Sequence, residues 1–464
     1  MVLATGGLVL HRAQASGPGD SPFLTPSVTL AAGKNSTTFA GPGVHGMISL
    51  SHSSVFAGQE TPVFADVRLV ADAQTETKSV VRAPISLAVV LDTSGSMQGE
   101  KMDEAKRSVL RLLSDMRDED EITLVRYDDT SELVQPLAKV GAVRASLTAR
   151  IRGLEAGGGT NIPGGLSHGM RALEEAARGR VRRIVLVSDG LDGTRSQAEN
   201  LARSSFASGI TVSSLGIGLD FDESYMGSVA QSGHGNFAFV KDGASLATFL
   251  KRELVETATT TVENARVRLR LPEGTRFVSA TGADATVSGR DVELAIGSLF
   301  AGDQRRVLVE LAAMAPASVG GGPIAIDTQA SWNLVGASPT TVGGGTLRLL
   351  ASTDPSVIES GRDGAVLASA TSVLASRRQI EAANAYSQGD IARANRLAKE
   401  NEEALASAIA AAPPAAAPAL DSQLKEYREQ KKTFNTHAPQ SVAGRAAAKA
   451  GAAKDMSNFS RSAF

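Results

Sequence analysis

Residues 87–96 read LAVVLDTSGS, and this stretch decides the fold. Residues 87–91 are all apolar, which is typical of a strand that is buried on both faces of a sheet. Asp92 and three hydroxyl residues follow within the next five positions. An amphipathic helix is then predicted from residues at helical spacing: Met102, Ala105, Val109, Leu112, Leu113 and Met116. In an open α/β sheet, such a strand-to-helix loop lies at the carboxyl edge, where ligands bind.

The same pattern extends over residues 84–256. Short apolar stretches alternate with helical ones, and the predicted strands are 85–91, 122–127, 184–187 and 212–217. This rhythm predicts an α/β domain with a mainly parallel, Rossmann-like sheet.

Residues 44–83 and 257–352 flank this domain and alternate between apolar and polar side chains. Val63, Ala65, Val67 and Leu69 carry the pattern before the domain. We predict one β-sandwich into which the α/β domain is inserted. Two separate β modules are the alternative, which is weaker because the leading piece has too few strands to be stable alone.

The two ends of the chain have a different character. Residues 1–43 are interpreted as a leader and a linker: residues 2–10 are mostly apolar and Ala13-Gln14-Ala15 resembles a signal-peptidase site, but the first cation, Arg12, comes after the apolar run. A shortened signal peptide and a plain disordered tail therefore both stay open. Residues 353–411 predict a helical hairpin that turns at 388–390, and residues 412–464 predict a linker, a short charged helix and a disordered tail.

The amino-acid composition excludes several classes of function. The chain has 464 residues, a net charge of −2 and no cysteine. Disulfides, thiolate metal sites and cysteine catalysis are excluded. The near-neutral charge gives no indication of nucleic-acid binding, and no stretch is long and apolar enough to span a bilayer. The oligomeric state is left open.

Polar side chains in two later loops extend the site after residue 91. Residues 157–161 read GGGTN and offer the hydroxyl of Thr160, and residues 188–190 read SDG and offer the carboxylate of Asp189. Both loops can reach the sheet edge that carries Asp92, Ser94 and Ser96. Carboxylate and hydroxyl oxygens suit Mg²⁺, with Mn²⁺ or Ca²⁺ also possible.

The set Asp92, Ser94, Ser96, Thr160 and Asp189 resembles the metal-ion-dependent adhesion site of von Willebrand factor type A (VWA) domains, whose motif is DxSxS followed by a Thr and an Asp. The resemblance implies that Ser94, Ser96 and Thr160 contact the metal directly. It implies that the two aspartates act largely through bound water. The layout with β segments on both sides is similar to bacterial secreted VWA proteins and to inter-alpha-trypsin inhibitor heavy chains.

The resemblance implies a non-enzymatic protein of adhesion or scaffold type. A partner protein would contribute an Asp or Glu carboxylate to the metal, outside the cytoplasm. The alternative is a cytoplasmic VWA subunit that docks on an AAA+ ATPase as an adaptor. A third hypothesis, a hydrolase that uses Ser94 or Ser96, lacks a histidine paired with an activated serine and a third orienting group.

Other motifs have structural interpretations. The glycines at 157–159 lack the Lys-Ser/Thr ending of a phosphate-binding loop. Asp128-Asp129 and the acidic cluster at 220–223 are interpreted as solvated loops rather than second metal sites. A structural role is predicted for both His168 and His234.

Overall fold

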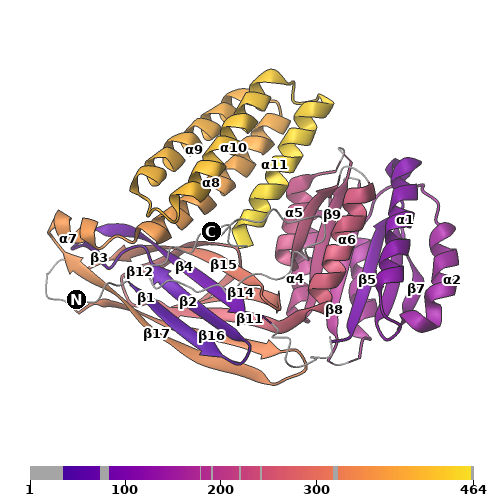
Figure 1. The fold of residues 1–464 in the computed structure, drawn as a ribbon, viewed down its shortest axis with the longest axis horizontal. Coiled ribbons are helices and arrows are strands. Elements are labelled where there is room, and N and C mark those ends of the chain that lie inside the picture. The colour runs from indigo at the N-terminus through magenta and orange to yellow at the C-terminus, as the bar shows by residue number, and fades with distance from the viewer. Residues whose placement is uncertain are drawn as a thin grey trace, which may run out of the picture.

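The computed structural model describes residues 35–73, 83–177, 179–189, 192–218, 221–240, 243–316 and 322–460. Three parts lie together in Figure 1: a β-sandwich, an α/β domain beside it and a helical bundle above the sandwich. Of the predicted leader and linker at residues 1–43, residues 1–34 lie outside the described residues, whereas residues 36–41 form a strand and not a linker. Among the described residues, no helix combines the length and the apolarity needed to cross a bilayer.

The α/β domain is built on a six-stranded sheet with the order β10-β9-β8-β5-β6-β7. All neighbouring strands are parallel except β6 and β7, which confirms the predicted mainly parallel sheet. The strands are β5 (Ile85–Asp92), β6 (Glu121–Tyr127), β7 (Ser131–Lys139), β8 (Val181–Ser188), β9 (Ile210–Ile217) and β10 (His234–Val240). The edge strands β7 and β10 were not predicted; both are only partly buried.

Helices cover both faces of this sheet. The helical segments are η1 (Gly95–Met97), α1 (Glu100–Asp115), α2 (Val140–Arg152), α3 (Ile162–Glu174), α4 (Arg195–Ala207), α5 (Glu223–Ser232) and α6 (Gly243–Ala258). Helices α1, α2 and α6 share one apolar core with Leu87, Val89 and Leu91, whereas α3, α4 and α5 share the other with Ala88 and Val90. Successive β5 side chains thus enter opposite cores, which explains the unbroken apolar run.

The β-sandwich has two sheets, with the orders β1-β2-β4-β15-β12 and β13-β14-β11-β16-β17-β3. Its strands are β1 (Ser36–Gly41), β2 (Val44–Leu50), β3 (Ser54–Phe56), β4 (Glu60–Ala71), β11 (Thr260–Arg270), β12 (Thr275–Thr281), β13 (Asp284–Ser288), β14 (Asp291–Phe300), β15 (Gln304–Met314), β16 (Ile324–Leu334) and β17 (Pro339–Ser352). The inner faces of the two sheets form one core around the fully buried Trp332.

The α/β domain is inserted into this sandwich. Strand β4, before the domain, pairs antiparallel with β15, after it. The exit and re-entry points also lie side by side, because Gly302 donates its N–H to the carbonyl of Ala71 and Ala301 donates to that of Thr259, at 3.1 and 2.8 Å. The two flanks therefore make one sandwich, and the alternative of two separate β modules is wrong.

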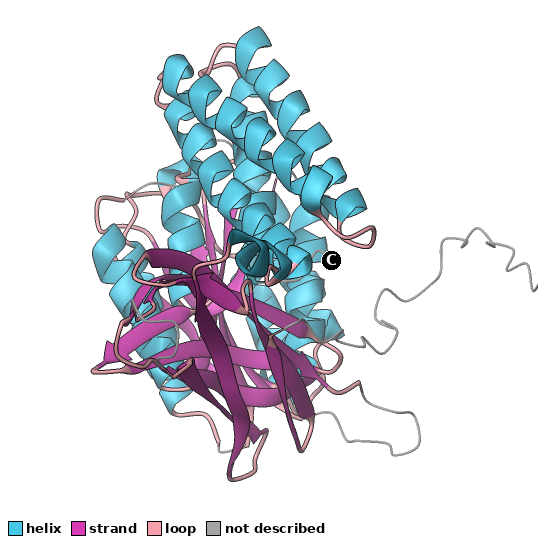
Figure 2. Cartoon of the chain, turned by 90° about the vertical axis from the view of Figure 1, so that its left-hand side faces the viewer, coloured by secondary structure: helices cyan, strands magenta, loops and turns pink. Residues whose placement is uncertain are grey.

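The C-terminal region is a bundle rather than a lone hairpin. Its helices are α7 (Pro355–Ser360), α8 (Gly364–Ser387), α9 (Ile391–Ala411), α10 (Ala417–Thr436) and α11 (Val442–Ser460). The predicted hairpin is present as α8 and α9, which turn at Gly389 with φ of 85°. Figure 2 shows the long helices above the strands of the sandwich.

The prediction of a disordered tail is wrong, because α11 occupies most of it. Its sequence is rich in Ala and Gly and carries few large apolar residues, so it shows no clear apolar stripe. Small side chains instead let α11 approach its neighbours closely. Ala448 and Ala452 are buried, and the Met456 side chain lies against Gly227 of α5.

Helix α11 joins the bundle to both other parts. Lys449 donates a hydrogen bond from Nζ to the carbonyl of Phe221 in the α/β domain at 2.5 Å, and its ammonium lies 4.3 Å from the centre of the Phe221 ring. Arg306 of β15, which is fully buried, donates to the carbonyl of Asn458 at 3.1 Å. The last helix therefore fixes the α/β domain and the sandwich relative to each other.

Candidate metal centre

The end of strand β5 places Asp92 at the carboxyl edge of the sheet. Its Oδ1 accepts a hydrogen bond from the backbone N–H of Ser94 at 2.8 Å, and its Oδ2 accepts one from the hydroxyl of Ser188 at 2.7 Å. The side chain is completely buried. Burial raises the pKa of Asp92 and repulsion from Asp189 adds to this, while the hydrogen bonds from Ser94 and Ser188 act in the opposite direction. Asp92 is thus rigidly oriented and poorly solvated.

The two serines of the motif connect Asp92 to Asp189. Ser96 donates from Oγ to Oδ1 of Asp189 at 2.7 Å, and the hydroxyl oxygens of Ser94 and Ser96 lie 3.0 Å apart. A carboxylate only accepts hydrogen bonds, so the single proton of Ser96 is used on Asp189 and Ser94 is the donor to Ser96. One lone pair of Ser96 remains, and a cation can use it.

The glycine loop brings Thr160 to the same edge. Gly157 donates its N–H to the carbonyl of Thr93 at 2.8 Å, and Gly95 donates to the carbonyl of Gly158 at 3.0 Å. These two bonds fasten the loop that ends in Thr160 to the loop that carries Ser94 and Ser96. The next residue, Asn161, caps helix α3 by accepting the N–H of Gly164 at 2.9 Å.

The carboxylate of Asp129 explains why this loop is made of glycine. Its Oδ2 accepts the N–H of Gly159 at 2.8 Å. A Cβ atom on Gly158 or Gly159 would lie 2.8 or 2.3 Å from a carboxylate oxygen of Asp129, and Gly158 also has φ of 78°. Asp129 therefore positions the Thr160 loop, a role that the interpretation as a solvated loop missed. A pair of acidic residues that directly follows a strand end was the signal.

Lys101 is a second residue that sequence reasoning missed. It stands in the first turn of α1, and its Nζ lies 2.5 Å from Oδ2 of Asp189. The Asp189 side chain is completely buried, whereas that of Lys101 is 28% exposed. The centre thus contains a cation of its own, and only the position of Lys101 just after the DxSxS motif could have indicated it.

The donor set fits a hard divalent cation. Asp92, Ser94, Ser96 and Asp189 form one hydrogen-bonded group, and Thr160 stands on the loop fastened to it. All the candidate ligand atoms in these side chains are oxygens, which Mg²⁺, Mn²⁺ and Ca²⁺ accept as ligands. The described residues contain no cluster of three or more His, Cys, Asp and Glu side chains that could hold a metal. Any metal here must therefore use the hydroxyls.

The group is open on one side. Asp92, Ser94 and Asp189 are buried, Thr160 is half-buried and Ser96 is exposed. An incoming group can therefore reach the hydroxyls from solvent without any rearrangement of the sheet.

The two histidines have other partners. His168 lies on α3, where its Nδ1 is 2.7 Å from the hydroxyl of Ser131. His234 stacks on Phe206 with ring centres 3.7 Å apart. The hydroxyls of Ser94 and Ser96 bond instead to each other and to Asp189. Asp222 of the acidic cluster caps α5 by accepting the N–H of Tyr225, and Asp220 lies outside the described residues.

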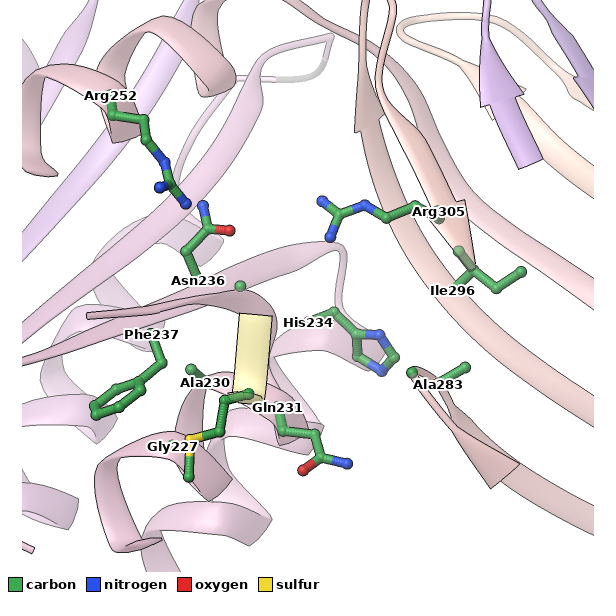
Figure 3. A pocket seen from close by; sticks show the side chains of 13 residues that line it. Gly227, Ala230, Gln231, His234, Asn236, Phe237, Arg252, Ala283, Ile296 and Arg305 are labelled. Atoms are coloured by element: carbon green, nitrogen blue, oxygen red, sulfur yellow. The ribbon is translucent and has the colours of Figure 1, made fainter. Parts of the chain in front are cut away.

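A cavity between the α/β domain and the sandwich lies elsewhere (Figure 3). His234, the first residue of β10, lines it, so it opens at the amino edge of β10 and not at the carboxyl edge that carries Asp92. Two arginines reach toward it, but each is paired: Arg252 Nε with Glu256 at 3.1 Å and Arg305 Nε with Asp303 at 2.9 Å. Because these carboxylates neutralise the two arginines, the arginines do not make the cavity an anion site.

Comparison with known proteins identifies similar α/β domains. Residues 86–252 match the von Willebrand factor type A domain. The uncharacterized Synechocystis protein sll0103 is 26% identical over 240 residues, which cover 49% of this chain and 57% of that protein. Inter-alpha-trypsin inhibitor heavy chain H2 of Mesocricetus auratus is 27% identical over 197 residues, which cover 39% of this chain and 21% of that protein. The chain thus spans less than two thirds of the length of these relatives.

Two solved structures share the wider fold. A von Willebrand factor type A protein from Catenulispora acidiphila superposes with a TM-score of 0.66 at 18% identity, over 86% of this chain and 91% of that one. The ArnB paralog VWA2 from Sulfolobus acidocaldarius superposes with a TM-score of 0.59 at 17% identity, over 90% and 99%. At these identities the likeness concerns the fold alone, and it extends well beyond the α/β domain. The chain thus contains a region, residues 86–252, that matches the von Willebrand factor type A domain.

Proposed function

We propose that this protein is a non-enzymatic binding protein of adhesion or scaffold type that recognises another protein through a divalent metal. Asp92, Ser94, Ser96, Thr160 and Asp189 would hold the ion, with Mg²⁺ expected first and Mn²⁺ or Ca²⁺ as alternatives. The observation that carries the proposal is the hydrogen-bonded group of Asp92, Ser94, Ser96 and Asp189 at the open carboxyl edge of the sheet.

The hydroxyl ligands favour an ion that binds a partner over an ion that the protein alone holds tightly. Two carboxylates and three neutral hydroxyls are a weak ligand set for a cation that prefers six or more oxygens. Ser96 is exposed, so a carboxylate from an Asp or Glu of the partner can complete the set from outside. A bound divalent ion would supply a positive charge for that carboxylate. Metal and partner would then strengthen each other's binding by the same factor.

The hydrolase hypothesis finds no support in these contacts. Neither His168 nor His234 is hydrogen-bonded to Ser94 or Ser96 among the described residues. The hydroxyl proton of Ser96 is committed to a buried carboxylate with a lysine partner. Activation of Ser96 by a histidine would require that histidine to accept this proton.

The test is a pull-down with the full chain as bait, in Mg²⁺ and in EDTA, followed by identification of the captured proteins. We expect a partner whose capture requires Mg²⁺ and falls at least tenfold with Thr160→Ala, about 1.4 kcal/mol. Thr148→Ala on α2 is the matched control, because Thr148 is also half-buried but only bonds to the carbonyl of Arg144. Equal capture in EDTA and in Mg²⁺ would show that recognition uses another surface.

We also propose that the protein works outside the cytoplasm, on the basis of the apolar residues 2–10 and the Ala13-Gln14-Ala15 sequence. Mapping the N-terminus of the protein isolated from its own cells tests this. A native N-terminus near residue 16 supports export, and an intact Met1 argues for the cytoplasm.

A further inference from the structure

The ammonium of Lys101 already acts as a counter-ion inside the candidate metal centre. It bonds to Oδ2 of Asp189 at 2.5 Å, while Ser96 bonds to Oδ1 of the same carboxylate at 2.7 Å. Both oxygens of Asp189 are therefore engaged by groups of the protein itself. Because Asp189 is completely buried, the interaction with Lys101 is poorly screened by water.

The fold makes room for this lysine. The Cε atom of Lys101 lies 3.1 Å from the place where a Cβ on Gly218 would stand. Gly218 directly follows β9, the strand next to β8, and has φ of 75°, so that position favours glycine for two independent reasons. The end of the Lys101 side chain thus lies beside Gly218, and its ammonium reaches Asp189.

The charges of the centre show what Lys101 changes. Asp92 and Asp189 are both buried, and the ammonium of Lys101 offsets part of their negative charge. A divalent ion therefore gains less electrostatic attraction at this centre with Lys101 present than without it. An anionic carboxylate from outside restores negative charge around the ion.

The chain of hydrogen bonds in the centre also indicates that the protein's own groups oppose metal binding. Ser94 donates to Ser96, and Ser96 donates to Asp189, whose second oxygen holds Lys101. Both oxygens of Asp189 are thus satisfied within the protein, and a cation that approaches Asp189 has to share or displace Ser96 and Lys101.

We infer that Lys101 is an internal competitor of the divalent metal, which weakens metal binding alone and makes it depend on an anionic carboxylate from the partner. The inference rests on the proposed function, since it concerns the same centre. It adds a regulatory residue: metal and partner bind together rather than in sequence. Lys101 acts through Asp189 and the local charge, and needs no contact with the partner.

The test is calorimetric titration of the full chain with Mn²⁺, comparing the wild type with Lys101→Met and Lys101→Gln. We expect both neutral variants to bind Mn²⁺ at least tenfold more tightly than the wild type. Lys106→Met is the control on the same helix, because its ammonium only donates to the carbonyl of Arg152 at 3.3 Å. This control should leave Mn²⁺ binding unchanged.

A second titration uses acetate as the carboxylate probe, at constant ionic strength and corrected for Mn²⁺–acetate in solution. Acetate should strengthen Mn²⁺ binding to the wild type by a larger factor than to Lys101→Met. Thermal unfolding gives a readout independent of titration: Mn²⁺ should raise the unfolding temperature of Lys101→Met more than that of the wild type. The Gln variant keeps a hydrogen-bond donor for Asp189 if Lys101→Met folds poorly.

The outcomes separate the two proposals. Wild-type binding of Mn²⁺ with equal affinity in the Lys101 variants overturns the role of Lys101 and leaves the metal centre intact. Weaker binding in the variants also overturns it, since Lys101 would then support the metal. Absence of Mn²⁺ binding up to millimolar concentration in the wild type and in every variant overturns the metal centre itself, and this inference with it.

Discussion

The hydroxyl of Ser96 donates a hydrogen bond to Asp189 at 2.7 Å, across 93 positions of sequence. Ser96 follows strand β5, whereas Asp189 follows strand β8, and these strands are neighbours in the sheet. Because both strands run in the same direction, their carboxyl ends meet at one edge. This bond links the two distant parts of the motif, and the first prediction removes the negative charge of its acceptor.

Asp189→Asn is expected to abolish binding of Mn²⁺ while the metal-free fold stays intact. The amide keeps the shape of Asp189 but removes its charge, and Lys101 is partly exposed, so its ammonium can turn to water. We expect the free energy of unfolding in EDTA to change by less than about 2 kcal/mol. Calorimetry with Mn²⁺ and urea unfolding in EDTA measure the two effects. A loss above about 3 kcal/mol without metal would assign Asp189 a structural role.

Asp129→Ala should loosen the glycine loop and with it Thr160. Asp129 accepts the N–H of Gly159 at 2.8 Å from an exposed position, so its loss should cost less than about 1 kcal/mol of stability. We expect Mn²⁺ affinity to fall by about three- to tenfold, because Thr160 is then held by fewer contacts. Unchanged Mn²⁺ affinity would show that the bonds of Gly157 and Gly95 alone hold the loop.

Gly159→Ala tests the same contact from the other side. A Cβ there would lie 2.3 Å from Oδ1 of Asp129, so the loop or Asp129 must shift. We expect weaker Mn²⁺ binding than in the wild type, and partial recovery when Asp129→Ala is added, because the clash is then removed. Additive effects in the double variant would contradict a direct contact between the two residues.

The buried Asp455 predicts a pH dependence of the bundle. Burial raises the pKa of Asp455 to about 7, although the hydroxyl of Tyr427 donates to it at 2.5 Å. Its pKa in the unfolded chain is near 4, so between about pH 4 and pH 7 the native state binds more protons than the unfolded state. The free energy of unfolding should therefore fall as pH rises through this window.

Asp455→Asn removes this titration and should stabilise the protein at pH 8 by about 1–3 kcal/mol, with little gain at pH 4. Asp421→Asn on α10 is the control, since Asp421 is half-exposed and pairs with Lys425 on its own helix. Urea unfolding between pH 4 and pH 8 measures both variants. A stability of the wild type that rises with pH while that of Asp455→Asn stays flat would contradict the raised pKa.

We expect helix α11 to contribute to the stability of the folded protein. Lys449→Met removes the bond to the carbonyl of Phe221 and the contact with its ring, and should destabilise the protein by about 1–2 kcal/mol. Lys454→Met on the same helix should change stability by less than about 0.5 kcal/mol, because Lys454 is exposed and pairs with Glu426 near the surface. Hydrogen exchange of residues 442–460 provides the direct check. Exchange at the rate of an unfolded chain would restore the view of a disordered tail.

The sequence by itself determined the features that depend on local pattern. The apolar run at 87–91 and the helical spacing after it predicted β5, α1 and the polar loop between them, and all three are present. The same kind of pattern predicted the inserted domain and the hairpin of α8 and α9. The grouping of Asp92, Ser94, Ser96 and Asp189 followed from strand ends, because parallel strands bring their carboxyl ends to one edge whatever the details of packing. The role of these residues and of Thr160 as metal ligands stays a prediction.

Only the tertiary structure decided the rest. Lys101 and Asp129 are charged residues on surface elements. The sequence around Lys101 does not indicate that it will pair with Asp189. Likewise, the sequence around Asp129 does not indicate that it will bond to Gly159. Helix α11 carries small side chains, so its place is set by close approach to its neighbours rather than by an apolar stripe. Hydrophobic periodicity reports which face of an element is buried. It does not report where a single charge or a small residue finds its contact, because such contacts form only after the elements have packed.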